Sequence, residues 1–241
     1  MTTSDSSNPS QAGPQVSRRS FLGGSVAGVA GGILGTASME FFEPDTLQAQ
    51  TNLTPDEALK HLMEGNDRFD SDKLTSLGQS LNILRQRTVN KQEPFAAVLA
   101  CADSRVPVEM VFDQTIGQLF VVRVAGNFTT PEIIGSLEYG AVVLGTKVIM
   151  VLGHSGCGAV KATIQGKDVP GQISSLFPHI QPAVDKSGGN FETAIKENAK
   201  IHAVLLAESS PVLAELVKDG KLKVVAGYYD LATGRVSLLQ D

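Results

Sequence analysis

Three short apolar segments constrain the fold of this chain more than any other feature. They occupy residues 95–101, 119–124 and 148–153, and polar and apolar side chains do not alternate regularly along them. Such runs are typical of strands that are buried on both faces of a parallel sheet. Between the last two runs lies an amphipathic segment, residues 131–145, which a Thr-Pro pair opens. The order of strand, helix and strand predicts a right-handed crossover unit and therefore an α/β fold.

The segments on either side extend this prediction. Thr54, Pro55 and Glu57 combine a helix N-cap, a proline at the first helical position and the glutamate of a capping box, so a helix is expected to follow. Two strands, at residues 223–229 and 236–239, are close enough in sequence to form a hairpin. The expected architecture is a central, mostly parallel sheet that is flanked by helices and has an antiparallel C-terminal edge strand. Further helices are predicted at residues 77–90, 191–209 and 211–218.

The first fifty residues have the composition of a leader and a targeting signal. Residues 1–17 are rich in Ser, Thr, Gln, Pro and Gly and have no apolar period, which predicts a disordered leader. Arg18 and Arg19 then precede an apolar stretch at residues 21–34, the layout of a twin-arginine signal peptide. That stretch is shorter than the roughly 20 residues of a membrane span, so no stable membrane anchor is expected. The signal predicts export by the twin-arginine machinery to the periplasm, or to the thylakoid lumen in a photosynthetic source.

Signal cleavage defines the remaining domain. Small residues favour cleavage near residue 37 or near residue 49. Residues 1–49 would then be the leader and signal, and residues 50–241 would form a single domain long enough for a substantial core. An alternative, in which this glycine-rich arm belongs to the fold, has no cap or heptad signal in its favour.

Charge and cysteine content restrict the partners. The chain has 20 Lys and Arg residues and 25 Asp and Glu residues, which give a net charge of −5. No basic run is long enough to follow a phosphate backbone. Nucleic acid is therefore not an expected partner. The two cysteines, Cys101 and Cys157, are too few for a disulfide framework but enough for half of a metal shell.

The two cysteines and one histidine follow predicted strands. Cys101 ends the first strand, and His154 and Cys157 follow the third. Ligands gather at the carboxyl edge of parallel strands, where these side chains would meet. Two thiolates and an imidazole make a tetrahedral zinc shell with one open position, which favours a catalytic site over a structural one. Two unrelated buried thiols, or a disulfide between them, remain alternatives.

An acidic and a basic residue lie beside the first cysteine. Asp103 is close enough in sequence to Cys101 to reach a metal or its bound water, and Arg105 would keep that carboxylate ionised. The alternative is a surface ion pair worth about 0 to 1 kcal/mol. At the end of a strand that also provides a metal ligand, the catalytic interpretation is favoured.

These segments resemble the β-class carbonic anhydrases. The most specific motifs are Cys101-Ala-Asp-Ser-Arg-Val106 and Gly153-His-Ser-Gly-Cys-Gly158, and the resemblance extends from about residue 56 to residue 239. It implies a β-carbonic anhydrase catalytic domain with one zinc ion per subunit. The implied zinc ligands are Cys101, His154 and Cys157, and the implied catalytic dyad is Asp103 and Arg105.

The same resemblance implies a reaction, an assembly and a substrate channel. The reaction is the reversible hydration of carbon dioxide to bicarbonate and a proton, by zinc-bound hydroxide with the Asp-Arg dyad. The site would lie at the interface of a homodimer or a higher homo-oligomer whose N-terminal helices wrap the partner. Gln92 would point towards substrate, Phe120 and Tyr139 would line a narrow apolar channel, and Gly158 would contribute a backbone N–H.

Two departures from the family pattern refine this expectation. Val124 stands where many members have asparagine, so the resemblance does not predict the local hydrogen bonding there. Val98 stands where the bicarbonate-inhibited bacterial subtype has tryptophan, so the plant-type subgroup with an open site is expected rather than an aspartate-ligated state. None of the remaining histidines is identified as a proton carrier, and packing or surface roles are favoured for His61, His179 and His202.

Two other functions remain open at this stage. One is a carbon disulfide or carbonyl sulfide hydrolase on the same fold with a changed access channel. The other is an inert zinc-binding scaffold, although a structural site has no use for the pair of Asp103 and Arg105.

Overall fold

A computed structural model of the protein describes residues 51–240. The predicted leader, the twin-arginine signal and both cleavage sites lie outside the described residues. In the part of the chain that the structure describes, no helix combines the length and the apolar character that a membrane span requires.

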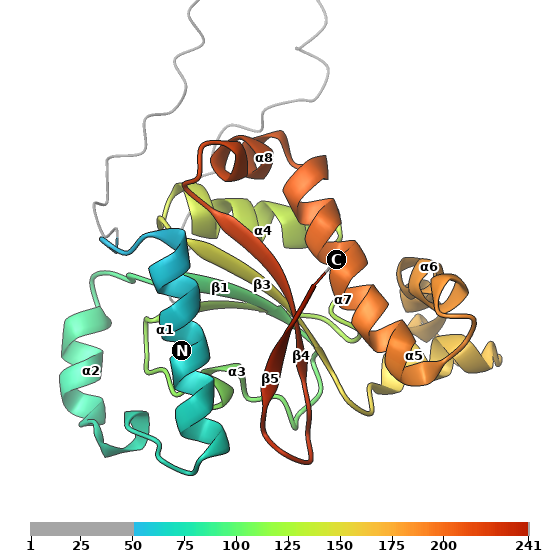
Figure 1. Ribbon diagram of the computed structural model, residues 1–241, viewed down its shortest axis with the longest axis horizontal. Helices are drawn as coiled ribbons and strands as arrows, with labels where there is room; N and C mark the ends of the chain where they lie inside the picture. Colours follow the sequence, from blue (N-terminus) through green and yellow to red (C-terminus); the bar gives the residue numbers. More distant parts are fainter. Residues whose placement is uncertain (1–50, 241) are drawn as a thin grey trace, which may run out of the picture. The chain divides into compact units, whose positions relative to one another are not determined.

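A five-stranded sheet forms the centre of this part of the chain, in the order β2-β1-β3-β4-β5 (Figure 1). Neighbouring strands from β2 to β4 run parallel, and β5 pairs antiparallel with β4. The mostly parallel sheet with an antiparallel C-terminal edge strand is therefore confirmed. The strands are β1 (Ala96–Ala100), β2 (Leu119–Arg123), β3 (Val148–His154), β4 (Lys223–Tyr229) and β5 (Val236–Leu239).

Helices connect and cover these strands. They are α1 (Pro55–Asp70), α2 (Leu81–Thr88), α3 (Val108–Val111), α4 (Pro131–Val142), α5 (Gly158–Gln165), α6 (Phe177–Lys186), α7 (Phe191–Ser209) and α8 (Pro211–Lys218), with 3-10 turns at Ser76–Gly78 and Ile173–Leu176. The capping box of α1 is present, because Thr54 Oγ1 accepts from Glu57 N–H and Glu57 Oε2 accepts from Thr54 N–H. The bounds of α7 and α8 match their predictions.

Two predicted helices are shorter than expected. The prediction at residues 77–90 was wrong in its first part, because Gln79 has an extended backbone (ψ 140°) and divides a 3-10 turn from α2. The segment at residues 131–145 ends its helix at Val142, three residues before Gly145, which has a left-handed backbone (φ +74°).

The sheet is buried on both faces, which explains its apolar strands. Alternate side chains of β1 face opposite layers: Val98 lies in a cluster with α1 and α3, whereas Leu99 lies in a cluster with α4, α7 and α8. Helices α1 and α7 accordingly lie on opposite sides of the strands (Figure 1). Because every second residue of a strand points to the same face, both sets of side chains in such a strand must be apolar.

The topology also fixes where a ligand can bind. From β1 the chain continues to β2 on one side, and from β3 it continues to β4 on the other. The carboxyl ends of β1 and β3 are therefore the switch point of the sheet, where parallel α/β proteins open a crevice. Cys101 follows β1 at this point, and His154 ends β3.

Candidate metal centre

Three potential metal ligands converge at the switch point. The Sγ atoms of Cys101 and Cys157 and a ring nitrogen of His154 all lie within 4.8 Å of one another. All three residues are buried, and both cysteines are free thiols. The two thiols therefore belong to one cluster and are not bonded to each other, so neither unrelated thiols nor a disulfide describes the structure.

The orientation of His154 leaves one nitrogen available. Its Nδ1 lies 2.9 Å from the carbonyl oxygen of Ser155, so Nδ1 carries the proton and donates it to that oxygen. Ser155 is itself held by its N–H, which donates to Tyr229 O at 2.9 Å. The Nε2 atom of His154 is buried and has no hydrogen-bond partner. A buried acceptor without a partner is costly, and a cation at this position would remove that cost.

The two thiols have opposite pKa shifts. A hydrogen bond from the Cys157 thiol, with a further one from the Gly126 N–H, holds the pKa of Cys101 below its usual range. The resulting thiolate, together with burial, raises the pKa of Cys157. Without a positive charge, one thiolate therefore opposes formation of the second. Zn²⁺ would supply that charge, and two sulfurs with one imidazole are its preferred ligands, so the residues present fit zinc.

A carboxylate lies beside this cluster. Arg105 Nε donates to Asp103 Oδ1 at 2.9 Å and Arg105 Nη2 donates to Asp103 Oδ2 at 2.7 Å. The guanidinium keeps the pKa of Asp103 well below its usual range, so this carboxylate is ionised at neutral pH. Asp103 Oδ2 is also 3.9 Å from His154 Nε2, which places it towards the ligand cluster rather than in an isolated surface pair.

Arg123 supports the turn that carries Cys101 and Asp103. At the end of β2, its Nε donates to Cys101 O at 2.9 Å and its Nη2 donates to Asp103 O at 2.6 Å. This role of Arg123 was not predicted. The signal that could have indicated it is an arginine at the end of an otherwise apolar strand, at the edge that carries the predicted ligands.

Gly126 is the second residue that sequence reasoning missed. Its N–H donates to Cys101 Sγ at 3.3 Å, and its backbone is left-handed (φ +93°). A Cβ at this position would lie 2.6 Å from Ile180 Cδ1, so both the conformation and the space require glycine.

The residues predicted to line the channel lie at the other end of the sheet. Phe120 pairs with Ala97 near the start of β1, and its ring is 6.2 Å from that of Tyr139 between centroids. Gln92 and Tyr139 line one cleft of about 310 Å³, which contains none of the metal ligands. A five-residue strand spans about 13 Å from first to last residue, so these side chains do not meet the metal ligands of their own chain. Gly158, which begins α5 directly after Cys157, does lie at the metal centre.

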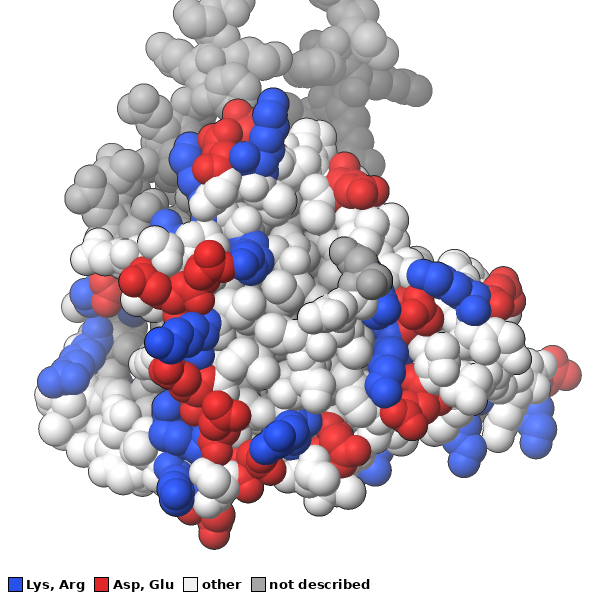
Figure 2. Space-filling model, viewed as in Figure 1, with Lys and Arg blue, Asp and Glu red and all other residues white. Residues whose placement is uncertain are grey.

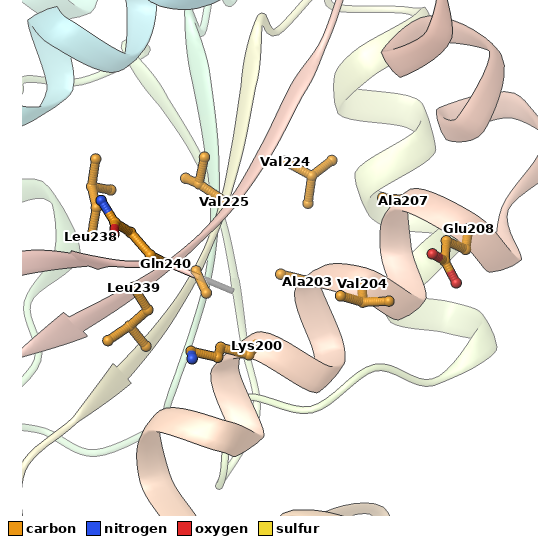
Figure 3. A pocket seen from close by; sticks show the side chains of 11 residues that line it. Lys200, Ala203, Val204, Ala207, Glu208, Val224, Val225, Leu238, Leu239 and Gln240 are labelled. Atoms are coloured by element: carbon orange, nitrogen blue, oxygen red, sulfur yellow. The ribbon is translucent and has the colours of Figure 1, made fainter. Parts of the chain in front are cut away.

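A larger groove elsewhere lacks such chemistry. It measures about 640 Å³ and lies between α7 and the strands β4 and β5 (Figure 3). Its lining is mainly aliphatic, with Lys200, Glu208 and Gln240 as the polar members, and none of the metal ligands reaches it.

Opposite charges lie next to one another on the surface. Figure 2 shows Lys and Arg side chains beside Asp and Glu over the described part of this face. Asp56 of α1 pairs with Lys223 of β4, and Glu197 of α7 pairs with Lys186. Ion pairs of this kind at a protein surface contribute little to stability.

Comparison with known proteins identifies the family. The family model described as carbonic anhydrase matches residues 96–236. Carbonic anhydrase 2 of Mycobacterium tuberculosis is 36% identical over 196 residues, which cover 78% of this chain and 94% of that protein.

Solved structures agree with the observed fold. The β-carbonic anhydrase CcaA has a TM-score of 0.61 at 23% identity, covering 76% of this chain and 95% of that one. One of two tetrameric β-carbonic anhydrases from Sordaria macrospora has a TM-score of 0.61 at 20% identity, covering 76% of this chain and 97% of that one. The chain therefore belongs to the β-class carbonic anhydrase family of enzymes.

Proposed function

We propose that this chain hydrates carbon dioxide reversibly to bicarbonate and a proton, using one zinc ion per subunit held by Cys101, His154 and Cys157. The observation that carries the proposal is the convergence of two sulfurs and an unpartnered imidazole nitrogen beside an ionised carboxylate. When bound, zinc would supply a nucleophile at neutral pH, because it lowers the pKa of a coordinated water to about 7.

Asp103 and Arg105 would form the dyad that orients this nucleophile. The carboxylate is ionised, so it accepts a hydrogen bond at Oδ2, the oxygen 3.9 Å from His154 Nε2. Arg105 fixes the plane of the carboxylate through two hydrogen bonds, and Arg123 fixes the backbone on both sides of Ala102. This arrangement holds the Asp103 carboxylate in a fixed orientation, which lowers the entropic cost of orienting the nucleophile towards carbon dioxide.

The open form of the site is the resting state that we propose. Both oxygens of Asp103 are engaged by Arg105, and the carboxylate is not among the three convergent ligands. Position 98, which is buried in β1, holds valine and not the tryptophan of the bicarbonate-inhibited subtype. These observations favour the plant-type subgroup, in which the fourth metal position is left for substrate chemistry.

A second copy of the chain would complete the substrate channel. Gln92, Phe120 and Tyr139 are distant from the metal ligands of their own chain, and Tyr139 is 45% exposed. In a two-fold dimer, the same surface of each copy faces the other, so these three residues can approach the partner's metal centre. We therefore propose a homodimer or a higher homo-oligomer, in line with the tetrameric proteins from Sordaria macrospora.

The first 49 residues would direct export. The proposal rests on Arg18 and Arg19 before the apolar stretch, and it places the mature enzyme in the periplasm, or in the thylakoid lumen of a photosynthetic source. Cell fractionation of the wild type and of a variant with both arginines changed to lysine tests it. Export of both proteins to the same extent would contradict a twin-arginine route.

Zinc content and carbon dioxide hydration, measured together on the purified protein, test the enzymatic proposal. Cys101→Ser should lose both tightly bound zinc and activity, whereas Asp103→Asn should keep zinc and lose most activity. A Cys101→Ser protein with normal hydration would overturn the assignment. Release of sulfide from carbon disulfide or carbonyl sulfide in place of hydration would indicate the alternative hydrolase, and bound zinc without either activity would indicate a scaffold.

A further inference from the structure

Two buried polar side chains on α7 contact the loop that follows β2. The loop, residues 124–129, leads from β2 to α4, and it provides the Gly126 N–H that reaches Cys101. Asn198 and His202 approach it from α7 and are 1% and 3% exposed. Since these residues are four positions apart, they lie on the same face of the helix.

Packing alone does not explain the asparagine. Asn198 Nδ2 donates to Gly126 O at 2.8 Å. A buried amide in apolar surroundings is costly unless it is hydrogen-bonded, and leucine has a similar volume without that cost. Its buried neighbours on α7 are mainly apolar: Ala194, Ile195, Ala199, Ala203 and Leu206.

A single residue, Gly126, connects Asn198 to the metal ligand Cys101. The carbonyl that Asn198 binds and the N–H that reaches the Cys101 sulfur belong to the same residue, Gly126. Both Gly126 (φ +93°) and Asn127 (φ +43°) have left-handed backbones, a combination that an unrestrained loop rarely keeps. Fixing the carbonyl limits the backbone rotation that would turn the N–H away from the sulfur.

His202 provides a second attachment farther along the same loop. Thr129 N–H donates to its Nδ1 at 3.2 Å, so its Nε2 carries the proton and faces His179 O at 3.1 Å. In the neutral imidazole, Nδ1 accepts one hydrogen bond and Nε2 donates the other. The loop is thus held from α7 at two points, on either side of Asn127 and Phe128.

We propose that Asn198 is a positioning residue for the metal centre, because it holds the Gly126 N–H on the sulfur of Cys101. This inference rests on the proposed zinc site. Loss of an outer-shell partner typically weakens metal binding about 10- to 100-fold, and Asn198 acts through one intermediate residue. We therefore expect a change at the lower end, about tenfold.

Asn66 offers a matched control for the same substitution. It is also 1% exposed, and its Nδ2 donates to Val111 O and Gly234 O at 3.0 and 2.9 Å. It joins α1 to the α3 region and the β4–β5 turn, and none of its hydrogen bonds involves a metal ligand or the loop at residues 124–129. Asn66→Leu therefore removes three buried hydrogen bonds, where Asn198→Leu removes one, and it does so without touching the metal centre.

The experiment compares Asn198→Leu and Asn66→Leu in the full chain. Zinc affinity is measured by competition with a chromophoric chelator, and the cobalt-substituted proteins are examined for the thiolate-to-cobalt charge-transfer band. We expect zinc affinity about tenfold lower and an altered cobalt band in Asn198→Leu, with both unchanged in Asn66→Leu. If the leucine variants do not fold, Asn198→Ser and Asn66→Ser make the same comparison with a smaller side chain.

Three results would overturn the inference. Wild-type zinc affinity and cobalt band in the Asn198 variants would exclude a positioning role while leaving the zinc site intact. Equal changes in the Asn66 variants would show general destabilisation instead. Failure of the wild type itself to bind zinc or cobalt would overturn the zinc site together with this inference.

Discussion

Arg105 holds Asp103 in a planar, two-point ion pair, with Nε 2.9 Å from Oδ1 and Nη2 2.7 Å from Oδ2. The backbone N–H of Arg105 adds a third bond to Oδ1 at 2.9 Å. The direction of the carboxylate towards His154 is thus a property of the pair and not of the aspartate alone.

The first prediction concerns the geometry of this pair. Arg105→Lys keeps the positive charge but loses the planar fork, so Asp103 should stay ionised and lose its fixed orientation. We expect kcat to fall about 10- to 100-fold while zinc is retained. Stopped-flow hydration and metal analysis check this, and a variant with wild-type kcat would show that charge alone is sufficient.

A second prediction uses two left-handed glycines. Gly126→Ala should destabilise the protein and weaken zinc binding, because its Cβ would lie 2.6 Å from Ile180 Cδ1. Gly166→Ala is the control, since Gly166 also has a positive φ (+59°) but nothing within 4 Å of the added Cβ. The control should cost about 1 to 2 kcal/mol of unfolding free energy and leave zinc binding unchanged. Equal losses of zinc affinity in both variants would contradict the role of Gly126.

The third prediction tests whether two copies share a site. Cys101→Ser and Tyr139→Ala should each be strongly impaired, because one lacks a metal ligand and the other part of the channel. When the two variants are unfolded and refolded together, about half of the dimers contain one subunit of each kind. In such a hybrid, one of the two sites combines an intact metal centre with an intact Tyr139 from the other subunit. About a quarter of wild-type activity should therefore return. No recovery in dimers shown by mass spectrometry to be hybrid would place Tyr139 outside the partner's site.

A fourth prediction follows from the burial of His202. Burial lowers the pKa of His202 to about 4 in the folded protein, below the value of 6.5 that it has when exposed. The unfolded chain therefore binds more protons between these two values, so this contribution to stability is complete above about pH 6.5 and decreases as the pH falls to about 4. The decrease should amount to roughly 3 kcal/mol in the unfolding free energy.

Denaturant unfolding of the wild type and of His202→Gln at stepped pH isolates this contribution. Other groups titrate equally in both proteins, so the difference between their unfolding free energies should shrink from pH 7 to pH 4. A difference that does not depend on pH would contradict the neutral, buried state of His202.

Sequence reasoning located the strands because the physical cause of each was local. Buried strands carry apolar side chains on both faces, and the strands β4 and β5 were predicted with their observed bounds. Helices α5 and α6 were not predicted. Helix α5 begins at Gly158, α6 contains Pro182 in its interior, and neither has a side-chain N-cap, so the capping signal that marked α1 is missing from both.

The site was predictable to the extent that its residues follow strands. Cys101, His154 and Cys157 could be grouped because parallel strands end at a common edge. Asn198 and Gly126 are 72 residues apart, and their contact depends on how α7 packs against the loop at residues 124–129. No local pattern encodes that packing, so Asn198 emerged only from the structure.

The position of the three ligands at adjacent strand ends links metal uptake to folding. Cys101 and His154 become neighbours only when β1 and β3 have paired in their native register. A chain that has not reached that register cannot present the full set of donors. A chain with all three ligands bound to metal would therefore already have β1 paired with β3. In any cell, the metal ion would have to be taken up in the compartment where the chain completes its folding.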